Sequence, residues 1–388
     1  MTQPGHDRRP IVDLTDEEAR RALVLKWGTV PDDVIPAWVA EMDYALDPVV
    51  HEALLRAVHD GITGYPVFGY TPELADAYAA FAGRHYGSAV DPAWVTPVVD
   101  VTTGVRVVLD ALCEDGPIVF PVPGYSPQLD VAALTGRKRV DLVVDPDASR
   151  AEVDLERLDA LFAEGARTLL LTQPHNPWGR VFTRAELAGI RDVVLRHGAR
   201  VVCDEIHAPL VLPGARHTSY LDLPGTHDHA VALVASSKAF NTAGLRCAQL
   251  VVPDPGDRQT LLDQPMSRND SWSPLGVVAA VAAYTDGDPW LASLVERLDQ
   301  LRSLLADLLA RHLPLARMRP LEATYLVWID VRAYGHVDPA AVALERGRVK
   351  LGPGHEYAPG LAGHVRLNLA TSPQRLAEIV RRLAAAWT

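Results

Sequence analysis

Cysteine, basic charge and long apolar runs are all scarce in this chain. Its three cysteines, Cys113, Cys203 and Cys247, lack the paired spacing of a zinc site and the density of a disulfide-rich secreted domain. We therefore expect buried thiols and no metal. No apolar run is long enough to cross a membrane, and the opening MTQPGHDRRPIVDLTDEE holds no apolar signal core. These absences predict a cytoplasmic protein without a membrane partner.

The charge balance is acidic. Lys and Arg number 37 against 49 Asp and Glu, which gives a formal net charge of −12 without any basic block. A nucleic acid would meet a repulsive average field, so we expect no nucleic-acid partner. Of the 388 residues, 48% are hydrophobic and 22% charged, as is typical of a globular enzyme that is folded throughout.

Short apolar runs alternate with helical patterns between about residues 90 and 255. Apolar runs separated by amphipathic helices are typical of a mostly parallel sheet that is covered on both faces, which predicts an α/β fold. One connecting helix is expected over 183–198, because Thr183 and Glu186 form a capping box and Gly198 supplies a stop. The predicted strands are 117–120, 140–144, 168–172, 201–204, 231–235 and 248–252.

The pattern changes beyond Asp286. A long helical stretch is followed by predicted strands at 325–331 and 364–370 and by a closing helix, which together indicate a smaller α+β domain. We expect residues 1–50 to form an N-terminal segment that packs on the small domain or the active site. The predicted large domain is 51–286 and the small C-terminal domain is 287–388.

Polar groups follow several of the predicted strands. Asn176 comes after 168–172, Asp204 ends 201–204, and Lys238 comes after 231–235. Each alone could be a turn former or a helix cap. An unpaired ammonium at the end of an apolar strand is costly, however, and the carboxyl ends of parallel strands meet at one edge of a sheet. The set therefore predicts one cofactor site.

Seven short motifs along the chain are distinctive: KWG (26–28), WVAEMDY (38–44), TGYP (63–66), HNPWGR (175–180), DEIHAPL (204–210), SKAFNTAGLR (237–246) and HVRLNLATS (364–372). With these motifs the sequence resembles the fold-type I pyridoxal-phosphate enzymes of the class I/II aminotransferase superfamily, and within it the cystathionine β-lyase, or C–S lyase, branch. That resemblance implies a large domain with a mostly parallel, seven-stranded sheet flanked by helices, a smaller α+β C-terminal domain, bound pyridoxal 5'-phosphate and a homodimer.

The resemblance implies a role for each residue around the cofactor ring. Lys238 would form the Schiff base with the cofactor aldehyde, and Asp204 would keep the pyridine nitrogen protonated. Asn176 and His207 would flank the phenolic oxygen, although a satisfied core histidine is an alternative for His207. Tyr125 would stack on the ring.

The phosphate would be held at the start of a helix expected near residue 107. The resemblance implies the backbone amides of Gly104 and Val105, the hydroxyl of Ser236, with Ser237 as the alternative, and the cation of Arg246.

Four further residues are implied to act at the edges of the site. Tyr65 would reach the phosphate of the neighbouring subunit, which places the active sites at a homodimer interface. Arg366 would bind the substrate α-carboxylate through a bidentate fork. Trp38 and Tyr44 would accommodate a thioether side chain, with docking in the core as the alternative.

The chain departs from the family at three positions. Ala235 stands where a serine is frequent, Arg106 where a small or apolar residue is common, and Glu41 where aspartate is frequent. These departures put the choice of substrate in question more than the binding of the cofactor.

The implied reaction is β-elimination of cystathionine or another S-substituted L-cysteine to a thiol, pyruvate and ammonia. An aminotransferase uses the same lysine and aspartate and is the alternative. A regulatory, partner-binding protein that keeps the fold is a third hypothesis. The identity of the substrate, and whether the enzyme serves primary metabolism or natural-product biosynthesis, stay open.

Overall fold

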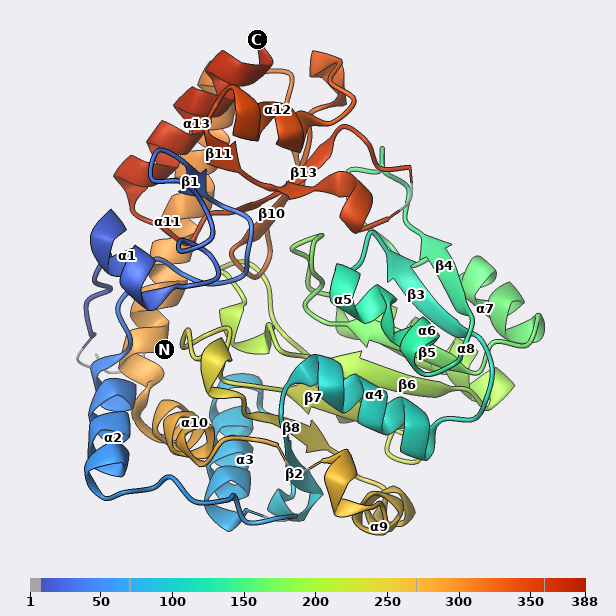
Figure 1. Ribbon diagram of the computed structural model, residues 1–388. Coiled ribbons are helices and arrows are strands. Elements are labelled where there is room, and N and C mark those ends of the chain that lie inside the picture. Colours follow the sequence, from blue (N-terminus) through green and yellow to red (C-terminus); the bar gives the residue numbers. More distant parts are fainter. Residues whose placement is uncertain (1–7, 70, 270, 359) are drawn as a thin grey trace.

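The computed structural model describes residues 8–69, 71–269, 271–358 and 360–388 and contains a seven-stranded sheet (Figure 1). The strand order is β2-β8-β7-β6-β5-β3-β4. Neighbours from β4 to β7 run parallel, whereas β8 is antiparallel to both β7 and β2, so the predicted mostly parallel sheet is confirmed. The strands are β2 (Val95–Val98), β3 (Ile118–Val122), β4 (Arg139–Val143), β5 (Thr168–Thr172), β6 (Arg200–Asp204), β7 (Ala230–Val234) and β8 (Ala248–Val251).

Helices cover this sheet on both faces. Leu170, Val202 and Leu233 point into the cluster under α4, whereas Leu171 and Cys203 point into the cluster under α8. Because both faces are buried, the inner strands β3 and β7 carry apolar residues at every position, which is why they read as continuous runs. The helices are α3 (Pro72–Tyr86), α4 (Val101–Leu112), α5 (Ser126–Leu129), α6 (Val131–Leu134), α7 (Leu155–Ala163), α8 (Arg184–His197), α9 (Pro255–Leu262) and α10 (Pro274–Asp286).

The predicted connecting helix is α8. Thr183 and Glu186 form the capping box at its start, and Gly198 ends it with a φ of 58°. That left-handed conformation carries little penalty for glycine, so the helix stops there.

The C-terminal part forms a smaller layer above the sheet (Figure 1). An antiparallel sheet has the order β12-β13-β10-β9 and contacts α12, while α11 packs against α13. The predicted strands and the closing helix are therefore confirmed. The elements are α11 (Asp288–His312), β9 (Arg317–Met318), β10 (Leu326–Asp330), α12 (Pro339–Glu345), β11 (Val349–Lys350), β12 (Gly352–Pro353), β13 (His364–Asn368) and α13 (Pro373–Trp387).

The N-terminal segment contacts both parts. After α1 (Asp16–Ala22), the short β1 (Ile35–Pro36) pairs in parallel with β11, whereas α2 (Pro48–His59) packs on α10. The division into 1–50, 51–286 and 287–388 stays a prediction.

The cysteines are buried free thiols, as expected. No helix in the described part of the chain is long and apolar enough to span a membrane.

Candidate active site

A cavity of about 330 Å³ opens at the carboxyl ends of β5, β6 and β7, beside the start of α4. The side chains of Tyr125, Asn176, Asp204, His207 and Lys238 line it together, although they come from distant parts of the chain. A larger, open groove of about 930 Å³ lies between α3 and α8, and its described lining includes none of these five residues. The smaller cavity is therefore the candidate active site.

Lys238 follows β7 and places its amine in this cavity. Its Nζ donates a hydrogen bond to the carbonyl of Ala40 at 3.2 Å. Burial, followed by the guanidinium of Arg366, lowers the pKa of Lys238 to about 8. A substantial fraction of the amine is therefore neutral near neutral pH, as a proton acceptor must be.

Asp204 ends β6 and is fully enclosed. Its Oδ1 accepts from the backbone N–H of Ile206 at 3.0 Å, and its Oδ2 accepts from Gln128 Nε2 at 2.6 Å. Burial raises the pKa of this carboxyl to about 6. Gln128 also lines the cavity, although it is not among the residues predicted from the sequence. Its position three residues after Tyr125 was the available signal.

Arg366 lies on β13, next to the cavity. Its Nη1 donates to Asn176 Oδ1 at 3.2 Å and its Nη2 donates to the carbonyl of Trp38 at 2.6 Å. Its Nε is buried and has no partner within the described ranges. Trp38 therefore contributes its carbonyl here, while its indole ring lies under the ammonium of Lys350 at 3.8 Å.

His207 and Tyr125 are the neutral rings of the cavity wall. Burial, followed by the charges of Lys238 and Arg366, lowers the pKa of His207 to about 3. Its Nδ1 has no hydrogen-bond partner among the residues that the structure describes. Burial also raises the pKa of the Tyr125 hydroxyl.

The prediction that the backbone amides of Gly104 and Val105 hold the phosphate is wrong, because α4 begins at Val101. That is about six residues before the expected start. The N–H of Gly104 already donates to the carbonyl of Asp100 at 2.8 Å, inside the helix. A Cβ on Gly104 would lie 2.6 Å from Leu233 Cδ2, so this glycine lets α4 approach the sheet. Val101 and Thr102, in the first turn of α4, line the cavity instead.

Two other groups lie at this end of the cavity. Of the two candidate serines, Ser237 lines it and Ser236 does not, as far as the described residues show. Arg246 lines it as well, and its guanidinium pairs with the carboxylate of Asp100 at 2.5 Å. Asp100 also caps α4 by accepting from the N–H of Thr103 at 2.7 Å.

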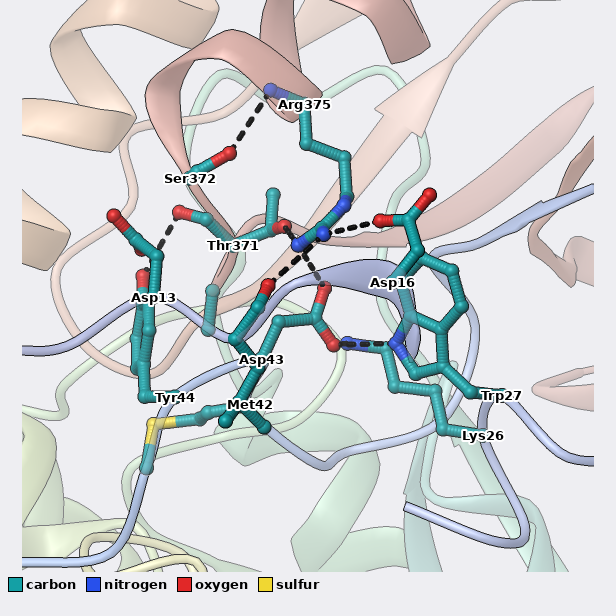
Figure 2. Close-up of polar contacts among 12 residues, drawn as sticks. Asp13, Asp16, Lys26, Trp27, Met42, Asp43, Tyr44, Thr371, Ser372 and Arg375 are labelled. Carbon is teal, nitrogen blue, oxygen red and sulfur yellow. Dashed lines mark hydrogen bonds and ion pairs between the residues drawn. The ribbon is translucent and has the colours of Figure 1, made fainter. Parts of the chain in front are cut away.

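Two predicted residues lie away from the cavity. Tyr44 is enclosed in the core with its hydroxyl donating to the carbonyl of Thr371 at 3.0 Å (Figure 2), which agrees with the alternative of docking in the core and not with a contact to the substrate. Tyr65 is 94% exposed, in a surface hollow that it shares with Trp272.

The chain matches the family model "Aminotransferase class I and II" over residues 25–383. It is 34% identical to the cystathionine beta-lyase of Corynebacterium glutamicum, covering 95% of this chain and 98% of that protein. It is 33% identical to the cystathionine beta-lyase PatB of Bacillus subtilis, with coverages of 95% and 98%. The crystal structure of cystalysin from Treponema denticola, which contains pyridoxal 5'-phosphate, superposes with a TM-score of 0.89 at 25% identity, covering 97% and 98% of the two chains.

The chain belongs to the class I and II aminotransferase family. It is a pyridoxal-phosphate-dependent enzyme, and the cavity fits that cofactor. A lysine amine, a buried carboxylate, an imidazole nitrogen without a partner among the described residues and the positive end of a helix all converge on it.

Proposed function

We propose that this enzyme is a C–S lyase that cleaves S-substituted L-cysteines, cystathionine among them, into a thiol, pyruvate and ammonia. The observation that carries the proposal is that the amine of Lys238 and the carboxylate of Asp204 open onto one cavity. The names of the relatives from Corynebacterium glutamicum and Bacillus subtilis support the lyase reaction over others of the family.

The residues divide the chemistry between them. Pyridoxal phosphate, when bound, supplies an electron sink that makes the substrate Cα–H bond acidic. Lys238 would hold the cofactor and, once released, accept the Cα proton on Nζ. Asp204 would keep a proton on the ring nitrogen, and Asn176 would bind the phenolic oxygen. Arg366 would bind the substrate α-carboxylate, because its buried Nε has no partner in the described part of the chain.

The phosphate would lie at the start of α4. The backbone N–H groups of Val101 and Thr102, the hydroxyl of Ser237 and the guanidinium of Arg246 are the available donors. Since Arg246 is paired with Asp100, the phosphate must compete with or lie beside that carboxylate.

We infer a homodimer in which Tyr65 reaches the site of the other subunit. Large apolar side chains are exposed around its loop, at the neighbouring end of α9 and in the segment that follows α9: Val67 is 71% exposed, Leu262 63% and Met266 60%. Exposed apolar patches of this kind mark interaction surfaces. The cytoplasmic location, the absence of nucleic-acid and membrane partners, and the three-part domain division belong to the same proposal.

A thiol-release assay tests the reaction. With cystathionine or an S-alkyl cysteine and no keto acid, we expect many turnovers per active site, with thiol, pyruvate and ammonia in equal amounts. Alanine, which has no leaving group at Cβ, should give little product. If thiol release stops after one equivalent and resumes only when a keto acid is added, the aminotransferase alternative replaces the lyase. If the cofactor binds but no amino acid turns over, the partner-binding hypothesis gains support.

A further inference from the structure

Residues 38–43, here called the strap, form a wall next to the reacting amine. The carbonyl of Ala40 accepts hydrogen bonds from Lys238 Nζ at 3.2 Å and from the hydroxyl of Tyr325 at 3.0 Å. The amide of Asn368 donates to two other strap carbonyls, each at 2.7 Å. The strap backbone is therefore held in place on both sides of the Ala40 carbonyl.

An ion-pair cluster anchors the end of the strap (Figure 2). The carboxylate of Asp43 accepts from Lys26 Nζ at 2.8 Å and from the indole N–H of Trp27 at 2.7 Å, and Arg375 lies 3.4 Å away. Asp43 and Lys26 are both 1% exposed. Lys26 Nζ also donates to the carbonyl of Glu41 at 2.9 Å. A satisfied, buried network of this kind fixes geometry, so the backbone of Glu41 has little freedom.

The side chain of Glu41 has no comparable partner among the described residues. It is half-buried, and its Oε2 is buried without a hydrogen bond to any residue that the structure describes. An unpaired oxygen out of contact with water carries a free-energy cost, which a positive charge nearby would offset. The charged groups that act on Lys238 are Arg366 from β13, which lowers its pKa, and three carboxylates that raise it: Glu41, Asp204 from β6, and Asp100 at the start of α4.

We propose that Glu41 is a positioning residue for Lys238: held by the strap next to the Ala40 carbonyl that binds Nζ, its negative charge stabilises the ammonium that forms when Lys238 accepts the substrate Cα proton. This step rests on the proposed function. The Cα–H bond breaks, an N–H bond forms on Nζ, and the electron pair passes into the Cα–Cβ bond as the thiolate leaves. Without Glu41, the new ammonium would face the guanidinium of Arg366 with less compensation.

The first test uses the cofactor-free enzyme and no substrate. Lys238 is labelled with pulses of acetic anhydride over a pH series, and the modified peptide is quantified by mass spectrometry. Wild-type labelling should have its midpoint near the pKa of about 8. In Glu41→Gln the midpoint should fall by about one pH unit, because the ammonium loses a neighbouring negative charge. Glu41→Asp should restore most of the shift, and Glu52→Gln, an exposed change on α2, should match wild type.

The second test uses the loaded enzyme. For Glu41→Gln we expect kcat to fall by about tenfold and KM to change by less than about twofold, with the acidic limb of kcat displaced to lower pH. An unchanged labelling midpoint overturns the proposal. A raised KM with unchanged kcat also overturns it, because Glu41 would then be a substrate contact. If the midpoint shifts but wild-type enzyme releases no thiol, the lyase assignment fails and the coupling of Glu41 to Lys238 stands.

Discussion

Asp204 and Lys238 are two enclosed groups whose pKa values shift in opposite directions for the same reason. Burial raises the pKa of the carboxyl to about 6 and lowers that of the amine to about 8, so each shift favours the neutral form. In the cofactor-free chain, burial therefore disfavours the charged forms of both groups at this site. A bound cofactor with a protonated ring nitrogen would give Asp204 an opposite charge.

Asp204 should make the stability of the cofactor-free enzyme depend on pH. Its carboxyl has a pKa of about 6 in the folded chain and an ordinary value of 3.8, so its stabilising contribution is present below 3.8 and is lost as the pH rises through 6. Asn carries no charge, so the stability of Asp204→Asn relative to wild type should rise by about 1.4 kcal/mol as the pH increases from about 5 to about 7.5. Thermal melts of both proteins measure this, and a difference that does not change with pH contradicts it. With cofactor and substrate, the same variant should lose activity by orders of magnitude.

Lys238 should be indispensable for turnover but not for folding. Lys238→Ala should lower kcat by more than about a thousandfold, because it removes both the attachment point and the proton acceptor. The thermal midpoint of the cofactor-free variant should equal or exceed that of wild type, since a buried amine is lost. Borohydride reduction of the wild-type holoenzyme should fix the cofactor to the peptide that contains Lys238. Near-normal pyruvate release by the variant would refute the assignment.

At the scale of elements, the sequence predicted the buried strands and missed the start of α4. The run 168–172 matches β5, because a strand enclosed on both faces carries a continuous apolar run, here three leucines between two threonines. The strand β2 was missed because it is short, contains Pro97 and is defined by its pairing with β8. The start of α4 was placed too late because Asp100 is followed by β-branched residues of weak helix propensity. Only tertiary packing shows that Tyr44 faces the core.

Gly104 should be needed for the docking of α4 on the sheet. A Cβ there would lie 2.6 Å from Leu233 Cδ2 and 3.2 Å from Leu250 Cδ2, so Gly104→Ala should destabilise the enzyme by about 1–3 kcal/mol. Gly83→Ala in α3 is the matched control, since its new methyl would meet nothing closer than 3.8 Å and alanine favours a helix. Urea denaturation compares the two. Equal midpoints for both variants would mean that α4 does not depend on this contact.

At the scale of the whole molecule, the residues proposed for one active site come from all three parts of the chain and from a second copy. The strap belongs to the N-terminal segment. Asp204 ends β6 of the large sheet, Lys238 follows β7, and Arg366 lies on β13. Tyr65 is the exception, because it lies at the surface and outside the cavity of its own chain. Whether Tyr65 contributes to an active site therefore depends on how two chains assemble.

Mixed dimers decide which site Tyr65 serves. Inactive Lys238→Ala chains and weakened Tyr65→Phe chains are combined and allowed to exchange subunits. If Tyr65 acts across the interface, each heterodimer has one site with both defects and one with neither. A statistical mixture should then recover about a quarter of wild-type activity, since half of the dimers are mixed and half of their sites are intact. Tyr65→Phe removes one hydroxyl from a side chain that is 94% exposed, so the fold of the variant chain should be unaffected. If exchange is verified by mass spectrometry and activity stays at the average of the two parents, Tyr65 acts within its own chain or not at all.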